Sequence, residues 1–489
     1  MTPGLILTPG LIRWAGFAGS AATAATAYLG GSGFVRVPSV NPLTLLSGQR
    51  GVLLPVCWVL GTTLLIGAWW FGRNVLPSTR WALVTVGLWL VPVLPFLPLG
   101  SADVYSYACQ GYVQHAGGDP YSTGVQEFGC PWLGSVATSW RDSPAPYGPL
   151  FLLLAARTVA VAGDSLAGVI AGLRVIALAG LALAAVGLPV LARRAGMDPA
   201  RAVWLLLACP LVLIHLVSGA HNDALMIGLI VAGLAMVASR STPGWLVAGG
   251  AVLGLAVAVK ATAVVVLPFA VLAVVPAGSA LRALWRPTAA IGGGALLATG
   301  ALSLLTGRGL GWVAGLLRSG DSVTWGSPST AVGLTADFVA GLVGWHTDAV
   351  PVTRAIGVLL LAAFLVWLWW RSRAGAALPA AGLALAATVL CAPVFHPWYA
   401  TWPLAVLAAT GTAARATAAA ATQAGAGAGA PAESRWLLGL CAFAATLTLP
   451  AGYNWALYTR IPGAVVVTAG LIVLVVVRVR RARDRRVFA

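Results

Sequence analysis

The residues best suited to chemistry lie in one polar stretch, residues 101–150, of an otherwise apolar chain. Tyrosine and tryptophan run all through this stretch. Disordered linkers are poor in aromatic residues, so we expect a folded loop that covers a site. Four of the 12 acidic residues of the protein fall here: Asp103, Asp119, Glu127 and Asp142.

Asp103 is the best candidate for catalysis. It follows the proline-rich segment VPVLPFLPLG, which places its carboxylate at the lipid–water boundary. Partial desolvation raises the pKa of a carboxylate unless a cation pairs with it, and a general base benefits from such a shift. Helix capping is the alternative, because Ser101 and Asp103 precede YSYACQGYVQHA, which we expect to form an interfacial helix.

Two further polar groups interrupt apolar runs. His221, Asn222 and Asp223 stand at the head of one run, where they could cap a helix or take part in the function. Lys260 is the only lysine and falls between two apolar runs. A charge at the centre of a bilayer costs about 2.5–3.5 kcal/mol, so this residue either binds an anionic headgroup or extends its ammonium to the membrane surface.

The remaining candidates have ordinary structural explanations beside functional ones. Asp119 in GGDPY and Tyr147 in PAPYGPL occupy turn sequences. His396 and Tyr399 could bind substrate or belong to an aromatic belt at the membrane surface. Outer arginines can grip a phosphate with two parallel hydrogen bonds, and the candidates are Arg141, Arg308 and Arg318.

The six cysteines show no metal-ligand spacing, and neither do the histidines. Only Cys109 and Cys130 fall in a predicted outer loop. A disulfide between them is plausible in an oxidising compartment, and two free thiols are the alternative.

Composition indicates an all-α polytopic membrane protein. Of the 489 residues 59% are hydrophobic and 8% are charged, whereas soluble proteins carry about 25% charged residues. Apolar runs long enough to cross a bilayer predict about fourteen transmembrane helices. The first run lacks a cleavage site and is expected to remain as an anchor. The predicted spans are 13–32, 51–71, 81–99, 168–191, 202–218, 223–240, 244–260, 261–277, 287–306, 351–370, 375–393, 398–413, 435–451 and 461–479.

The distribution of arginine predicts the topology. Most arginines fall on one side if both termini are cytoplasmic, as the positive-inside rule requires. This arrangement needs residues 148–163, which are short and interrupted by Arg157, to form a re-entrant or interfacial helix on the outer side. The net charge of +17 is then explained by anionic lipid rather than by nucleic acid.

We expect one membrane domain over residues 1–489, with the polar features on the outer face. Its expected parts are an extracytoplasmic catalytic loop at 100–167, a second large outer loop at 307–350, a flexible cytoplasmic linker at 414–434 and a basic cytoplasmic tail at 478–489.

Several motifs taken in order resemble those of a known family. The resemblance extends from the second span to about residue 405, and the last spans and tail contribute no motif. The motifs are DVYSY at 103–107, GGDPY at 117–121, WRDSPAPYGPL at 140–150, HNDALMIGL at 221–229, the lone Lys260 and HPWYATWP at 396–403. They are similar to those of the polyprenol-phosphomannose-dependent alpha-1,6-mannosyltransferases, integral-membrane glycosyltransferases of the GT-C class.

The resemblance implies a fold, a reaction and roles for residues. The donor would be a mannosyl polyprenyl monophosphate in the outer leaflet, and the acceptor a mannose 6-hydroxyl on an envelope glycolipid of the lipomannan type. Asp103 would be the catalytic base of an inverting transfer, which needs a single carboxylate. No metal or other cofactor is expected. The other residues implied in substrate binding are Tyr105, Asp119, Arg141, Tyr147, His221, Asn222, Asp223, Lys260, His396 and Tyr399, with Lys260, Arg141 and His396 as candidates for the phosphate.

Two alternatives remain open. One is a GT-C transferase that uses another polyprenyl-phosphate sugar or another acceptor. The other is a secondary transporter. Transporters often have internal repeats and polar groups at the membrane midplane, whereas here we find no repeat and the polar groups gather at one face.

Overall fold

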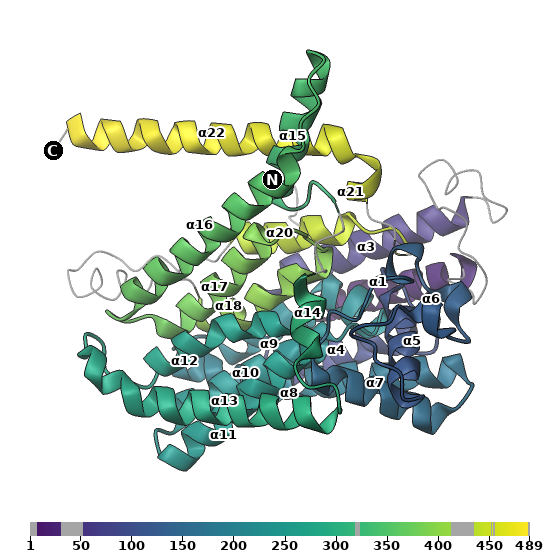
Figure 1. The fold of residues 1–489 in the computed structure, drawn as a ribbon, viewed down its shortest axis with the longest axis horizontal. Coiled ribbons are helices and arrows are strands. Elements are labelled where there is room, and N and C mark those ends of the chain that lie inside the picture. The colour runs from purple at the N-terminus through teal and green to yellow at the C-terminus, as the bar shows by residue number, and fades with distance from the viewer. Residues whose placement is uncertain are drawn as a thin grey trace. The chain divides into compact units, whose positions relative to one another are not determined.

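The chain is described by a computed structural model over residues 7–30, 52–317, 323–411, 435–450, 452 and 455–487. Regular structure within these ranges is helical (Figure 1), which confirms the predicted all-α class. Backbone packing divides the chain into two units, which are described in turn.

The first unit comprises Met1–Ser319, Leu368–Ala386 and Pro397–Tyr453. Its α-helices are α1 (Pro9–Gly30), α3 (Leu53–Gly72), α4 (Thr79–Leu90), α5 (Asp103–His115), α6 (Val125–Phe128), α7 (Pro149–Ala162), α8 (Leu166–Arg194), α9 (Pro199–Leu207), α10 (Asp223–Ser239), α11 (Pro243–Val259), α12 (Leu267–Leu272), α13 (Trp285–Leu305), α14 (Gly311–Leu317), α18 (Thr401–Thr410) and α20 (Arg435–Thr446). Its short or non-α helices are η1 (Val91–Val93), η2 (Leu133–Ser135), η3 (Thr138–Trp140), η4 (Val212–Ser218), η5 (Ala261–Val266), η6 (Leu281–Leu284) and η7 (Pro397–Ala400).

The second unit comprises Gly320–Trp367, Ala387–His396 and Asn454–Ala489. It contains α15 (Pro328–Leu342), α21 (Trp455–Tyr458) and α22 (Arg460–Val487). The helices α16 (Ala349–Ser372) and α17 (Ala377–Cys391) each belong partly to both units. A small core around Ala331, Leu334 and Ala464 packs α15 against α22.

Five helices in the described ranges are long and apolar enough to cross a membrane, or six if α9 and η4, bent by 66°, form one span. The chain is therefore a membrane protein. The predicted number of about fourteen spans stays a prediction, because many apolar helices are shorter than a full span. The five helices cover Leu53–Gly72, Leu166–Arg194, Leu281–Leu305, Ala349–Ser372 and Arg460–Arg480.

Three predicted spans are wrong as continuous α-helices, and proline accounts for the breaks because it lacks the amide hydrogen that a helix needs. The span 81–99 leaves the helical conformation after Val93, in a stretch with Pro95 and Pro98. The span 202–218 breaks near Pro210 and continues as a π-helix. The span 261–277 begins as a 3-10 helix and then has only the six-residue α12, which begins just before Pro268.

The segments expected outside the membrane contain helices of their own. The segment 307–350, expected as a large outer loop, contains α14 and α15, and α15 starts with a proline at its first turn, a favoured helix start. The predicted helix at 148–163 is present as α7. The linker at 414–434, Arg318 and the end of the tail at 488–489 lie outside the described residues.

Close helix packing positions the segments that carry the candidate residues. α8 crosses α10 where Gly180 and Gly228 meet, and a Cβ atom on Gly228 would lie 2.0 Å from the Gly180 carbonyl oxygen. Small residues let membrane helices approach in this way. This contact fixes α10, whose first residue is Asp223.

A buried arginine ties two functional segments together. Arg174 of α8 donates to the Leu94 carbonyl at 2.8 Å and to the Ser218 carbonyl at 3.0 Å. The Ser218 hydroxyl in turn accepts from the Leu99 amide at 3.0 Å. Because Asp103 follows Leu99 closely and His221 follows Ser218, these bonds hold the two segments in register.

Candidate active site

The site lies where the start of α5 meets the start of α10. Asp103 is the first residue of α5, and its side chain is 15% exposed. Its Oδ2 lies 3.9 Å from Nδ1 of His221. The cap position of α5 is Ala102, and Ser101 accepts a bond from the Asp103 amide at 3.0 Å. The Asp103 carboxylate is therefore not the helix cap that the sequence left open.

A second carboxylate is buried beside the first. Asp223 is fully buried, and its Oδ2 lies 3.8 Å from His221 Nδ1. Its Oδ1 accepts bonds from Lys260 Nζ at 2.9 Å and from the Trp402 indole at 2.7 Å. These side chains follow one another in space in the order Lys260, Asp223, His221 and Asp103. His221 therefore lies between Asp223, which is paired with Lys260, and Asp103.

Lys260 does not extend to the membrane surface as one sequence interpretation proposed. Its side chain is 11% exposed, and its ammonium lies 4.6 Å from the centre of the Tyr399 ring and 4.9 Å from that of Trp402. Aromatic faces stabilise a cation, most strongly away from water. The lysine is thus held inside the protein by a carboxylate and two rings.

Aromatic side chains form the wall around Asp103 and His221. The Tyr107 hydroxyl lies 3.1 Å from His221 Nδ1. Its ring stacks edge-on against those of Tyr147 and Phe151, with centres 5.1 and 4.9 Å apart. Tyr147 is placed by its neighbour Gly148, whose amide donates to the Val259 carbonyl next to Lys260. A Cβ atom on Gly148 would lie 2.2 Å from the Ala258 carbonyl oxygen, so only glycine fits here.

A second histidine lies behind the first. The His215 and His221 rings are 6.0 Å apart, and Trp398 packs on both. His215 Nε2 lies 3.1 Å from the Thr448 hydroxyl. These contacts fix the plane of the His221 ring.

Burial raises the pKa of Asp103 from 3.8 to about 6. α5 belongs to the polar stretch outside the predicted spans. Bonds to Ser101 and Trp140 and the charge of Lys260 oppose the shift, and the charge of Asp223 adds to it. Asp103 is therefore a carboxylate near neutral pH and a stronger base than an exposed aspartate.

Asn222 adds a buried amide to the site. It is 1% exposed, and neither its side-chain oxygen nor its nitrogen has a hydrogen-bond partner among the residues that the structure describes. Such groups are rare in folded proteins and call for an explanation. Its position between His221 and Asp223 makes it a candidate to bind substrate.

The structure thus brings together six of the predicted residues: Asp103, Tyr147, His221, Asp223, Lys260 and Tyr399, with Asn222 adjacent in sequence. Other candidates lie elsewhere. Tyr105 comes two residues after Asp103 in α5, and residues two apart on a helix do not face each other. Asp119 accepts a hydrogen bond from the Tyr121 amide at 2.9 Å, as expected if its role is to form the turn. Arg141 donates to the Val136 carbonyl within its own loop. His396 belongs to the second unit.

The sequence reasoning missed three residues of the site: Tyr107, His215 and Trp402. Two of them carry a helical signal that could have been read. Tyr107 is one turn after Asp103, and Trp402 is three residues after Tyr399. His215 lies within an apolar run and has no such signal.

Cys109 and Cys130 form a disulfide, with their Cα atoms 5.5 Å apart. The bond fixes α5 to the segment that follows it. We expect neither cysteine to react with an alkylating agent unless a reductant is added. Mass spectrometry of the unfolded protein checks this, with Cys57, Cys209, Cys391 and Cys441 as internal positive controls. Alkylation of both Cys109 and Cys130 without reductant would contradict the pairing.

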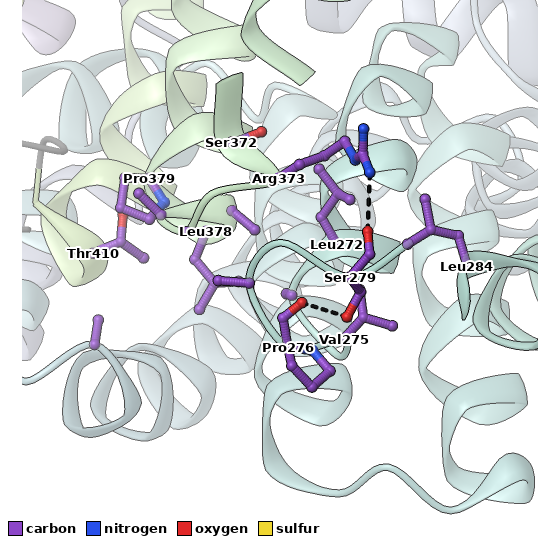
Figure 2. A pocket seen from close by; sticks show the side chains of 16 residues that line it. Leu272, Val275, Pro276, Ser279, Leu284, Ser372, Arg373, Leu378, Pro379 and Thr410 are labelled. Atoms are coloured by element: carbon purple, nitrogen blue, oxygen red, sulfur yellow. Dashed lines mark hydrogen bonds between the residues drawn. The ribbon is translucent and has the colours of Figure 1, made fainter. Parts of the chain in front are cut away.

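A separate cavity of about 370 Å³ lies between residues 272–284 and residues 372–379 (Figure 2). Arg373 donates to the Ser279 carbonyl at 2.9 Å, and the Ser279 hydroxyl donates to Pro276. The lining is apolar apart from Ser279, Ser372, Arg373 and Thr410, and it contains no carboxylate. This cavity therefore lacks a candidate base.

No cluster of three or more metal-ligating side chains occurs in the part of the chain that the structure describes. The chemistry that the site offers is that of a carboxylate base, a histidine and a buried lysine–aspartate pair.

These features define a helical membrane protein with a buried ionisable site, and comparison with known proteins identifies its family. The family model described as the N-terminal domain of alpha-(1->6)-mannopyranosyltransferase matches residues 13–276. The model of the MptB C-terminal domain matches residues 329–479. The chain therefore belongs to the alpha-(1->6)-mannopyranosyltransferase family.

Individual relatives agree. The chain is 35% identical to alpha-(1->6)-mannopyranosyltransferase A of Mycobacterium tuberculosis, over 82% of this chain and 80% of that protein. It is 31% identical to alpha-(1->6)-mannopyranosyltransferase A of Corynebacterium glutamicum, over 72% of this chain and 77% of that protein. It is 33% identical to alpha-(1->6)-mannopyranosyltransferase B of the same species, over 66% of this chain and 58% of that protein. No solved structure matches the chain. The resemblance drawn from the sequence is confirmed, and the transporter interpretation gains no support.

Proposed function

We propose that the protein is an inverting alpha-1,6-mannosyltransferase with a GT-C fold. It transfers mannose from a polyprenyl monophosphomannose to a mannose 6-hydroxyl of an envelope glycolipid of the lipomannan type. The active site faces the extracytoplasmic side, and both termini are cytoplasmic. The observation that carries the proposal is the largely shielded carboxylate of Asp103, set 3.9 Å from His221 in a chain of this family.

In the proposed reaction Asp103 takes the proton of the acceptor 6-hydroxyl as its oxygen attacks the anomeric carbon. The bond from that carbon to the phosphate oxygen breaks, and its electron pair leaves on the phosphate. A β-linked donor then gives an α-linked product in one displacement, with no covalent enzyme intermediate.

The two carboxylates have different environments, which supports different roles. Lys260 and Trp402 bind Asp223, so its charge is balanced inside the protein. Asp103 has a raised pKa and no direct bond to a cation among the described residues. Where two titratable groups are separated in this way, the group with the raised pKa is the acid–base residue.

Substrate positioning falls to the groups around this pair. Asn222 offers an amide to a sugar hydroxyl, and Tyr107 and Tyr147 offer ring faces and hydroxyls. Lys260 supplies positive charge near the base for the departing phosphate, with Arg141 of the same unit as a further candidate.

The pH dependence follows from the Asp103 pKa. A general base must be deprotonated, so kcat/KM should rise as the pH passes through about 6 and reach a plateau above it. Initial rates between pH 4.5 and 8.5, with stability checked at each pH, measure this. A profile that is flat between pH 5 and 7 would contradict the assignment.

Purified protein in detergent tests the proposal directly. The assay combines mannosyl polyprenyl phosphate with a short alpha-1,6-mannoside, in the presence of a chelator. Transfer under these conditions supports donor class, linkage and independence from a dissociable metal. Turnover only with another polyprenyl-phosphate sugar would replace the mannose assignment and keep the mechanism.

A further inference from the structure

Two polar side chains of α5 are buried without a use in the mechanism. Ser106 and Gln110 are each 1% exposed. Within the described part of the chain, the Ser106 hydroxyl and both amide atoms of Gln110 have no hydrogen-bond partner. A glutamine amide can make four hydrogen bonds, and burying it with none is unfavourable. A residue in this state usually has a partner that is not part of the chain.

Helix geometry places Gln110 in line with the base. Positions 103, 107, 110 and 114 share one face of α5, and Ser106 lies at its edge. The rise of an α-helix sets Gln110 about 10 Å along the axis from Asp103. Linked sugar rings extend over such a distance.

Gln114 is the next residue on this face, and its side chain is bound by other parts of the protein. The Gln114 amide donates to the Thr306 carbonyl, and its oxygen accepts from Arg308. Both amide atoms of Gln114 thus have a protein partner, whereas neither amide atom of Gln110, one turn closer to the base, has one among the described residues.

The segment after α5 contributes a third open polar group. Tyr121 is 5% exposed, and its hydroxyl has no hydrogen-bond partner in the described ranges of the chain. Its ring lies against Gly311, close in sequence to Arg308. The Tyr121 hydroxyl therefore belongs to the neighbourhood at the Gln114 end of the same helix face.

We infer that Ser106 and Gln110 form a subsite for the acceptor saccharide, binding the sugar that precedes the mannose receiving the transfer. This inference rests on the proposed function. The groups are neutral donors and acceptors, which suit the hydroxyls of a neutral polyol; a phosphate would call for cations. Both side chains are buried, so binding of the acceptor requires a local opening of the packing around α5.

Binding of alpha-1,6-mannotriose to the full-length protein in detergent tests the subsite, followed by tryptophan fluorescence or by saturation-transfer NMR. Gln110→Leu should weaken binding at least about 10-fold, and Ser106→Ala by about 3-fold. Gln110→Leu should leave the melting temperature unchanged or higher, because leucine removes an unpartnered buried amide. Gln126→Leu, an exposed change in the following segment, is the matched control and should bind as wild type does.

Transfer kinetics add an independent measurement. Gln110→Leu should raise the acceptor KM about 10-fold and leave the donor KM within about 2-fold. Equal mannotriose affinity in Gln110→Leu and wild type, or no binding by wild type, would overturn the subsite. A melting temperature that falls together with affinity would overturn it too. Wild-type protein that binds mannotriose but transfers no mannose would refute the proposed function alone.

Discussion

Replacing Asp103 by asparagine is expected to lower mannosyl transfer by about 10²–10⁴-fold. Asparagine keeps the size and hydrogen-bonding shape of the side chain and loses the ability to take a proton. Its neighbours, His221 and Ser101, should keep their positions. Initial rates with saturating donor and acceptor measure the loss, and activity within a few-fold of wild type would exclude Asp103 as the base.

The stability of this variant separates a catalytic role from a structural one. The pKa of Asp103 is raised from 3.8 to about 6 by folding. Its contribution to stability is therefore present below pH 3.8 and lost as the pH rises through 6. Above that pH the folded state carries a buried charge, which asparagine removes. The melting temperature of Asp103→Asn at pH 7.5 should equal or exceed that of wild type.

A matched control uses a carboxylate of the same stretch. Asp142 is exposed, and Asp142→Asn makes the same chemical change away from the site. Its activity should stay within about 2-fold of wild type, since surface substitutions have small effects. A comparable loss in both variants would indicate that the loop, and not Asp103, sets the rate.

The sequence was sufficient to predict the helical membrane class and to single out Asp103, which the structure places 3.9 Å from His221. The low charge content and the apolar runs follow from burial in lipid, which acts on composition directly. Asp103 stood out because it combines a carboxylate, a boundary position and an aromatic-rich surrounding. Each of these properties is local, so a linear reading can find it.

The arrangement within the site depends on contacts between distant segments. Lys260 and Asp223 are 37 positions apart, and Trp402 and Asp223 are 179 apart. No local pattern marks such a pair, so the sequence offered a membrane-surface or headgroup role for Lys260 instead. Arg141 likewise looked suited to bind a phosphate, whereas its guanidinium donates to the Val136 carbonyl in the same loop.

The breaks in three predicted spans have a local cause, the prolines within them. Hydropathy measures apolar length and does not register a missing backbone hydrogen bond. The segment containing Pro210 is largely apolar and still bends by 66°, which places its polar residues His215 and Ser218 near the site. The departure from a straight span is therefore part of how the site is built.

Removal of the Lys260 charge is expected to have the largest effect on stability. Lys260→Met keeps the length of the chain and leaves the Asp223 carboxylate buried with no cation. Breaking a buried ion pair from one side costs about 3–5 kcal/mol. Thermal unfolding in detergent should show a clearly lower melting temperature, with a smaller yield of monodisperse protein. An unchanged melting temperature would mean that the pair seen at 2.9 Å does not form.

The double variant Lys260→Met/Asp223→Asn distinguishes charge balance from catalysis. Both charges are absent in it, so most of the stability that each single variant loses should return. The double variant should therefore be less destabilised than the sum of the losses in Lys260→Met and Asp223→Asn. Transfer should stay low, because the departing phosphate still lacks the positive charge that Lys260 supplies near Asp103. If transfer also recovers, Lys260 serves only to neutralise Asp223, and another cation of the same unit, such as Arg141, must bind the phosphate. The pair of measurements therefore assigns the lysine to stability alone or to stability and leaving-group binding together.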